Sequence, residues 1–466
     1  MVLVLILVVL LSTSFANYAL TTKTTNIIYG SAPYLTFDGG RTRVTNTEAL
    51  LGISLSDGRT FTPTTNDSSS TNPIELPAIG QSSADIGMLV PTDTDSIALS
   101  SLIGTPHNYW GDDDGDGQGI DGITATGSLN LSIVDKNNQA VARNEVLTIC
   151  KAPYKLTLSN GEGTLKTRYG VPNESRFSAS RVTYYINPNQ QTPAICFAKP
   201  IMKYGGTDYR PDLAGPVAMW DLDKGFLTQS FTPSSYGLNF PTTGANNLYF
   251  DLLIIGTNQA LSWAPVSHGG ITATMTDSTN TSVKVTLTGP VATESQWSSD
   301  NPGPIDRLSL PQVFELVGRD SSGNAVVKYG FELKQWFVHR GASTYNHSSV
   351  ESWCNKIGGY RVPNVKDLTN ASCRGRDIDP DDCQGAVGAT PSSPVYFYMR
   401  HIGAGFFTEW GNMVEYTGAK FASYSDYWTQ DMTGNSQEFF TVNAGSGYVS
   451  RNYGIRDINF GLCVYP

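Results

Sequence analysis

Residues 353–368 have the sequence Trp-Cys-Asn-Lys-Ile-Gly-Gly-Tyr-Arg-Val-Pro-Asn-Val-Lys-Asp-Leu. Four apolar residues recur here at the i, i+3, i+4 and i+7 spacing of one helix face: Val350, Trp353, Cys354 and Ile357. Ser348 and Glu351 predict a capping box at the start of this helix. The two glycines at 358–359 predict its end, because glycine readily adopts the left-handed backbone of a helix C-terminus.

The residues around this helix predict an α+β region. A strand is predicted at residues 331–338, before the helix. A second short helix is predicted after Pro363, with Asn364 as its cap. From residue 394 onward the chain is aromatic and β-like, and it closes with an apolar run at 460–464.

The chain before this region is predicted to be almost wholly β. The segments expected to form strands or hairpin arms are 129–133, 146–149, 156–158, 248–255, 271–275 and 283–287. Asn160-Gly161 is a strong hairpin signal. Strands at this spacing predict a β-sandwich, with an Ig-like domain as the last part of residues 17–300. A linker is predicted at 298–306, and the α+β domain is predicted to occupy residues 301–466.

The N-terminus predicts export. Residues 1–11 are an unbroken apolar run, and Ser14 and Ala16 fall at the −3 and −1 positions of a signal-peptidase site. Eleven residues are too few to cross a bilayer, which takes roughly 20, so residues 1–16 are predicted to be a cleaved signal peptide. The alternative is a poorly processed anchor, because the run lacks a basic start. No later stretch predicts an integral membrane span.

Composition and cysteine content agree with export. Only 15% of the 466 residues are charged, and the net charge of −10 offers no basic face for nucleic acid. Six cysteines in an exported chain predict three disulfides, for which fifteen pairings exist. Two cysteines lie in the first half and four in the last third: Cys150, Cys196, Cys354, Cys373, Cys383 and Cys463. No CxxC or CxxH pair occurs in the sequence, so a zinc site is not expected.

The order of these elements resembles a C-type-lectin-like domain. The run at 353–368 is similar to its two-helix region, and Tyr427-Trp428-Thr429 and Gly461-Leu462-Cys463 are similar to its later core strands. More specifically, the chain resembles the intimin/invasin family of bacterial adhesins, in which Ig-like domains precede a C-terminal lectin-like tip. Residues 240–251 are similar to the β-rich adhesion domain of that family. The family's outer-membrane barrel and long Ig stalk have no counterpart here.

The resemblance implies a disulfide pattern and a function. The implied pairs are Cys354–Cys463, Cys373–Cys383 and, as the remaining pair, Cys150–Cys196. The implied function is a secreted or surface-associated, non-enzymatic adhesin that binds a host-cell surface protein or glycan through its lectin-like domain. An additional bacterial protein is expected to anchor it. The calcium-ligand triplets typical of sugar-binding C-type lectins are absent, so the fold does not imply calcium-dependent sugar binding.

Residues 112–121 are the clearest candidate for a metal site. Carboxylates alternate there with glycines, which allows the backbone to wrap oxygen ligands around Ca²⁺. The expected ligands of a structural calcium ion are Asp112, Asp114, Asp116 and Asp121. Ile123 stands where an EF-hand needs glutamate, so the loop is irregular, and a solvated acidic loop is the alternative. Asp377, Asp379, Asp381 and Asp382 form a second, weaker acidic cluster.

The candidate ligand-binding residues lie near the C-terminus. Five residues between two predicted core strands are Tyr448, Arg451, Tyr453, Arg456 and Asp457. Tyrosine and arginine dominate interface hot spots, because they combine large contact area with directed hydrogen bonds. Core packing is the alternative for both tyrosines, and the loop at 374–394 is a second candidate surface.

Other function classes have weaker support. The five histidines are scattered, and no HExxH or Gly-x-Ser-x-Gly pattern occurs. A structural or assembly subunit is the first alternative to an adhesin. An enzyme of the formylglycine-generating type, which has a related fold, is the second alternative.

Overall fold

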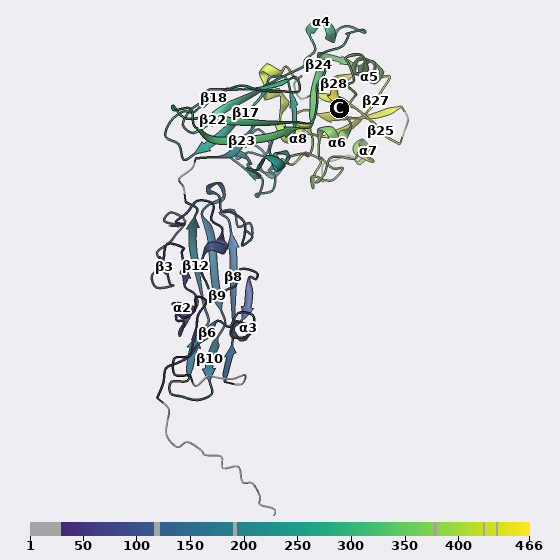
Figure 1. Ribbon diagram of the computed structural model, residues 1–466. Helices are drawn as coiled ribbons and strands as arrows, with labels where there is room; N and C mark the ends of the chain where they lie inside the picture. The colour runs from purple at the N-terminus through teal and green to yellow at the C-terminus, as the bar shows by residue number, and fades with distance from the viewer. Residues whose placement is uncertain (1–28, 116–121, 190–192, 376–379, 423–424, 435–436) are drawn as a thin grey trace, which may run out of the picture. The chain divides into compact units, whose positions relative to one another are not determined.

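The computed structural model describes residues 29–115, 122–189, 193–375, 380–422, 425–434 and 437–466. Its contacts divide the chain into two compact units, both built on β-sheets (Figure 1). The first unit comprises Met1–Ser68, Ala84–Ile133 and Leu156–Tyr184. The second comprises Ser69–Ser83, Val134–Lys155 and Tyr185–Pro466. The predicted signal peptide at 1–16 lies outside the described residues.

Short strands dominate the first unit. Its elements are β1 (Tyr34–Leu35), α2 (Thr47–Leu50), β2 (Ile53–Ser54), β3 (Thr60–Phe61), β5 (Ser96–Ala98), α3 (Leu99–Ile103), β6 (Trp110–Gly111), β7 (Ile123–Thr126), β8 (Ser128–Val134), β9 (Tyr154–Asn160), β10 (Gly163–Thr167), β11 (Glu174–Phe177) and β12 (Ser180–Asn187). One sheet has the order β4-β12-β9-β8-β5, where β4 is Ile74–Glu75. In β8 the alternating Leu129, Leu131 and Ile133 are buried, which confirms the strand predicted there.

Two local predictions in this part of the chain were wrong. Asn160-Gly161 does join β9 to β10, but these strands do not pair. β10 instead lies between β11 and β7 in a separate three-stranded sheet. Residues 146–149 form no strand, and a 3₁₀ helix begins at Ile149. A turn signal reverses the chain locally, but the available partner edges decide which strands pair.

The second unit contains a β-sandwich. Its elements are β13 (Ala194–Lys199), η3 (Pro211–Leu213), β14 (Trp220–Asp221), β15 (Gly225–Leu227), η4 (Pro233–Leu238), β16 (Thr243–Ala245), β17 (Leu248–Ile255), β18 (Ser262–Trp263), β19 (Val266–His268), β20 (Ile271–Thr276), β21 (Ser282–Thr288), α4 (Glu294–Trp297), β22 (Gln312–Arg319) and β23 (Ala325–Leu333). One sheet has the order β14-β15-β13-β17-β21-β20-β19, and the other has β18-β22-β23. The predicted strands at 248–255, 271–275 and 283–287 are all present.

The remainder of the second unit is the α+β region. Its elements are β24 (Gln335–Tyr345), α5 (His347–Lys356), α6 (Val365–Leu368), α7 (Pro380–Cys383), α8 (Phe406–Trp410), η5 (Met413–Glu415), η6 (Thr417–Ala419), β25 (Asp426–Met432), β26 (Glu438–Asn443), β27 (Val449–Tyr453) and β28 (Asn459–Tyr465). The strands form one sheet in the order β16-β24-β28-β25-β26-β27. This arrangement confirms the predicted fold class, a mostly β chain that ends in an α+β region.

The first helix of this region is present, but its cap differs from the prediction. The N-cap is Asn346, whose side chain accepts the N–H of Ser349 at 3.0 Å. The helix therefore begins at His347, ahead of the predicted Ser348. The second helix, α6, does begin after Asn364, which forms a capping box with Asp367.

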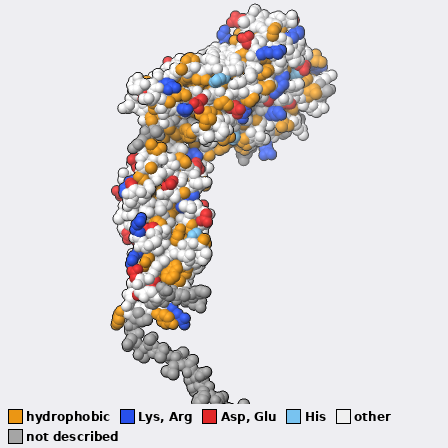
Figure 2. Space-filling model, in the orientation of Figure 1, with side chains coloured by type: hydrophobic (Ala, Val, Ile, Leu, Met, Phe, Trp, Pro, Cys, Tyr) orange, Lys and Arg blue, Asp and Glu red, His pale blue; other side chains and the backbone are white. Residues whose placement is uncertain are grey.

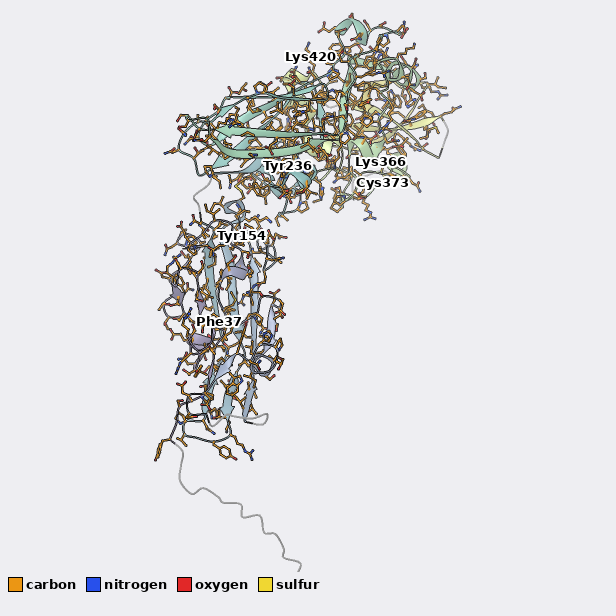
Figure 3. The ribbon with its side chains drawn as sticks, viewed as in Figure 1. Phe37, Tyr154, Tyr236, Lys366, Cys373 and Lys420 are labelled. Atoms are coloured by element: carbon orange, nitrogen blue, oxygen red, sulfur yellow. A yellow bond between two sulfur atoms is a disulfide. The ribbon has the colours of Figure 1, made fainter. Side chains whose placement is uncertain are left out.

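The three disulfides implied by the resemblance are present. Cys354–Cys463 ties α5 to β28, and Cys150–Cys196 closes a separation of 46 residues. Cys373 (Figure 3) follows α6 and pairs with Cys383 across a separation of 10 residues. The described residues include no free cysteine.

The segment predicted as a linker at 298–306 packs against α5 instead. The Ile305 N–H donates to the Ile357 carbonyl at 2.9 Å, and Lys356 Nζ donates to the Asp300 carbonyl at 2.6 Å. Strands from both sides of residue 300 also share sheets, because β18 pairs with β22 and β16 with β24. The domain limits at 300 and 301 stay a prediction.

A buried polar network joins the sandwich strands to the α+β region. The carboxylate of Glu409 in α8 accepts N–H and O–H bonds from Thr242 and Thr243, at 2.6 to 3.1 Å, and the N–H of Gly403 at 2.8 Å. Nearby, the buried Arg400 guanidinium donates to main-chain carbonyls, including those of Tyr204 and Glu409. Burial raises the pKa of Glu409, and its hydrogen bonds oppose that shift.

We expect the long-range disulfide to stabilise the protein more than the short-range one. Loop-closure entropy predicts about 4.8 kcal/mol for the Cys354–Cys463 separation and about 2.7 kcal/mol for Cys373–Cys383. Denaturant unfolding of the Cys354→Ala/Cys463→Ala and Cys373→Ala/Cys383→Ala variants measures both losses. Equal losses would contradict the loop-entropy account.

Acid should destabilise the second unit through His339 in β24. This side chain is 5% exposed and packs against Trp297 and Phe421, and burial lowers its pKa from 6.5 to about 4. The unfolded chain therefore binds the proton more tightly, so stability is complete above pH 6.5 and falls toward pH 4. The loss is about 3 kcal/mol.

Thermal melts between pH 7 and pH 4 measure this effect. His339→Gln should flatten the pH dependence relative to wild type, whereas His268→Gln, at an exposed position, should leave it unchanged. Parallel curves for the wild type and His339→Gln would refute the assignment.

Candidate functional site

The predicted ligand-binding residues lie on and after β27, the last strand in its sheet. β27 pairs with β26, and Tyr453 lies directly across from Glu438. Val449, Arg451 and Tyr453 lie on the same face of the strand, where Val449 is buried and Arg451 and Tyr453 are exposed. The chain then turns through Gly454 and returns as β28.

Glu438 holds two of these residues in place. Its carboxylate is largely buried and lies 3.7 Å from the Arg451 guanidinium. A hydrogen bond with the same carboxylate raises the pKa of the Tyr453 hydroxyl. Because one buried anion fixes both side chains, a ligand that meets them loses little side-chain entropy on binding.

The turn after β27 is closed by Asp457. Its carboxylate accepts the Tyr453 N–H at 2.7 Å, and its own N–H donates to the Tyr453 carbonyl at 2.9 Å. The Arg456 guanidinium lies 5.6 Å from the centre of the Tyr453 ring, as in a cation–π pair. Asp457 therefore shapes the surface, whereas Arg456 and Tyr453 are presented on it.

Sequence reasoning missed two residues of this surface. Ile455 is 79% exposed and Ile458 is 61% exposed. The available signal was two isoleucines in the otherwise polar loop Gly-Ile-Arg-Asp-Ile-Asn at 454–459, where neither fits a strand alternation. We call the exposed set the β27 surface: Arg451, Tyr453, Ile455, Arg456 and Ile458.

The base of the β27 surface is rigid. The Gly454 carbonyl accepts the N–H of His347 at 3.1 Å, and the imidazole of His347 stacks on Phe439 at 3.6 Å between ring centres. This packing places the turn against the first residue of α5. Burial lowers the pKa of His347, as expected for a packed structural histidine.

Tyr448 lies at the other end of β27, apart from this surface. Its hydroxyl donates to Asp382 at 3.2 Å, and its ring packs edge-on against Tyr396 at 5.9 Å. Tyr448 is half-buried and belongs with the second candidate surface, the loop at 374–394. In that loop Asp377 and Asp379 lie outside the described residues.

The structure covers the calcium candidate only in part. Asp112 and Asp114 are described, whereas Asp116 and Asp121 are not. Asp114 accepts the N–H of Ser31 at 2.7 Å, and the intervening Asp113 pairs with Arg43. Within the described part of the chain, no three His, Cys, Asp or Glu residues are grouped to hold a metal ion. Calcium binding at 112–121 stays a prediction.

Surface charge is mixed. On the face shown in Figure 2, basic and acidic side chains are interspersed, and hydrophobic ones are scattered between them. The described residues contain no helix with the length and apolarity to cross a membrane. His401 contacts the main chain, with Nδ1 2.8 Å from the Ile402 carbonyl oxygen.

Comparison with known proteins gives distant structural neighbours only. No family model and no curated protein matches the chain. The fold is similar to invasin, a bacterial integrin-binding protein, at 14% identity and TM-score 0.35, over 74% of this chain and 52% of that one. It is also similar to a C-terminal intimin fragment in complex with the intimin-binding domain of the translocated intimin receptor, at 12% identity and TM-score 0.32, over 75% and 90%.

A mutant intimin from EHEC O157:H7 is a third neighbour, at 12% identity and TM-score 0.28, over 53% of this chain and 93% of that one. The chain thus spans about half of the invasin chain, 52%. At these identities and TM-scores the neighbours assign neither a family nor an activity to this chain.

Calcium binding would stabilise the folded protein. A ligand that binds only the folded state adds about 2.7 kcal/mol at a hundredfold excess over its Kd, so melts in calcium and in chelator should differ. Asp112→Asn/Asp116→Asn should abolish the difference, whereas Asp57→Asn should preserve it. Superimposable wild-type melts would leave the solvated-loop alternative.

Proposed function

We propose that this protein is a secreted or surface-associated bacterial adhesin that binds a host-cell receptor through the β27 surface. The proposal rests on one observation above all. Ile455 and Ile458 are exposed beside Arg451 and Tyr453, both of which converge on the buried carboxylate of Glu438. Exposed apolar side chains next to positioned arginine and tyrosine are typical of binding surfaces.

The composition of this surface favours a protein receptor over a glycan. Two exposed isoleucines offer apolar area that a protein partner can bury, whereas a sugar requires mainly hydrogen-bonding groups. Arg456 and Tyr453 can supply the directed contacts that give hot spots their specificity. A glycan receptor remains an outcome of the binding test.

Localisation outside the cell agrees with three disulfides, which persist in oxidising compartments. The apolar N-terminal run at 1–16 is consistent with export. We further propose that a bacterial anchor protein holds the adhesin at the surface. A structural subunit of a surface complex is the alternative function, and the same surface would then bind a bacterial protein.

Substitution on the β27 surface should reduce adhesion without unfolding the protein. We expect Arg456→Ala and Ile455→Ser each to weaken binding to cultured host epithelial cells by about 1–2 kcal/mol, roughly a 5- to 30-fold loss. Melting temperatures should barely move, because surface substitutions usually change stability by less than about 0.5 kcal/mol. Flow cytometry with the labelled full chain measures binding.

Arg319→Ala is the matched control, because Arg319 is an exposed arginine at the end of β22 in the sandwich. Full binding by both surface variants would refute the assignment of the receptor site. Retained binding after glycosidase treatment of the cells, together with loss after protease treatment, would identify a protein receptor. The reverse pattern would identify a glycan.

A further inference from the structure

A recess lies at the start of α5, and its lining does not include the side chains of the β27 surface. Its volume is about 300 Å³, and its lining is polar. The side chains that matter here are Asp300, Arg340, Ser348, Ser349, Ser352 and Lys356. They come from β24, from the first two turns and the end of α5, and from the segment that follows α4.

Arg340 is the unusual member of this set. Its side chain is 1% exposed, and its guanidinium stacks on Tyr345 with 3.7 Å between the guanidinium carbon and the ring centre. Nε donates to the Trp297 carbonyl at 3.0 Å, and Nη1 donates to the carbonyl and hydroxyl oxygens of Ser349 at 3.0 and 2.9 Å. These contacts fix the plane of the guanidinium.

The Tyr345 side chain also forms a hydrogen bond with the guanidinium, and the remaining nitrogen, Nη2, forms a long ion pair with Asp300. The nearest carboxylate is Asp300, whose oxygen is 3.8 Å away and whose side chain is 96% exposed. A buried cation is costly unless it is paired and hydrogen-bonded. An exposed carboxylate beyond hydrogen-bond distance compensates this charge poorly, because water screens it.

The recess also holds hydroxyl and ammonium groups, and the Ser348 hydroxyl donates to the Asn346 side-chain oxygen at 3.2 Å. Ser348 and Ser352 are exposed hydroxyls on the first turns of a ten-residue helix, whose N-terminus carries a partial positive charge. Lys356 holds its ammonium group at the mouth of the recess through its 2.6 Å bond to the Asp300 carbonyl. A fixed guanidinium with adjacent hydroxyl and ammonium donors matches the oxygens of an anion.

We propose that this recess binds the oxyanion of a small ligand, a carboxylate or sulfate carried by an acidic sugar. Ligand pockets span roughly 300–1,000 Å³, so a recess at the lower limit admits one monosaccharide and excludes a folded partner. Nη2 of Arg340 contacts the anion, the Ser352 hydroxyl bonds a sugar oxygen, and the already exposed Asp300 carboxylate moves away from Nη2. This site is independent of the proposed receptor surface.

Calorimetric titration of the full chain tests the proposal. The probes are glucuronic acid, glucose 6-sulfate, sodium sulfate and neutral glucose. Glucuronic acid or glucose 6-sulfate should bind and glucose should not, and added salt should weaken the binding. If glucuronic acid binds more tightly than glucose 6-sulfate, the preferred anion is a carboxylate, and the reverse order identifies a sulfate. If sodium sulfate binds as tightly as glucose 6-sulfate, the ligand is the free ion.

Asp300→Asn removes the competing carboxylate and should raise the affinity about three- to tenfold, whereas Arg340→Lys should lower it at least about tenfold, because lysine lacks the planar fork. Glu162→Gln, at an exposed carboxylate in the first unit, should change nothing. Arg340→Lys also disturbs the bonds to Trp297 and Ser349, so a surface substitution provides the second test.

Ser352→Asp places a carboxylate at the recess without touching the core, and Ser352→Asn is its neutral control of the same size. Loss of binding in Ser352→Asp alone supports the site. Equal binding of glucose and the acidic probes, or equal binding by the two Ser352 variants, overturns it. Receptor adhesion should be unchanged in all these variants, which separates this result from the test of the β27 surface.

Discussion

The buried carboxylate of Glu409 connects parts of the chain that lie 166 and 167 residues apart in sequence. It accepts hydrogen bonds from Thr242 and Thr243, which lead into β16, and β16 pairs with β24 at the edge of the α+β sheet. Removing one partner from such a network leaves several buried donors unsatisfied, at a cost of about 1–3 kcal/mol each. The sandwich and the α+β region therefore share one hydrophobic core, which extends from Ile195 to Val464.

Arg400 reinforces this connection from the other side. Its guanidinium donates to carbonyls of the 201–204 loop and of Glu409. A single cation therefore supplies hydrogen bonds to carbonyls that irregular main chain would otherwise leave unsatisfied. Gly411 has a φ of +82°, and a Cβ there would lie 2.1 Å from the Arg400 guanidinium. Glycine is the residue that tolerates both the positive φ and the close approach of the Arg400 guanidinium at this position.

The same frame positions both candidate sites. Cys354–Cys463 fixes α5 against β28, and α5 then supports the β27 turn through His347 and lines the anion recess with its serines. Binding groups on a rigid support lose little conformational entropy when a ligand arrives. The two sites thus differ in form, one an exposed surface of isoleucine, tyrosine and arginine and the other a polar recess beside a buried arginine, yet both depend on one short helix.

Much of the architecture could be predicted from sequence. The strands at 248–255, 271–275 and 283–287, the two helices after residue 346 and the exposure of Arg451 and Arg456 follow from periodicity and residue type. The predicted cap at Ser348 was wrong because Asn346, two residues earlier, caps the helix by accepting the N–H of Ser349. Asn and Ser caps have similar intrinsic energies, so residue type alone does not choose between the two positions.

Sequence by itself determined the β-rich class, the presence of α5 and α6 and the number of disulfides, because these depend on local periodicity and on residue chemistry. Tertiary structure alone decided that β10 leaves β9 for another sheet, that residues 298–306 pack on α5, and that Tyr448 lies away from Tyr453. It also decided that Arg340 is buried with one nitrogen directed to a recess. These features arise from contacts between distant segments, and such contacts form only when the whole core closes, so no window of sequence carries them.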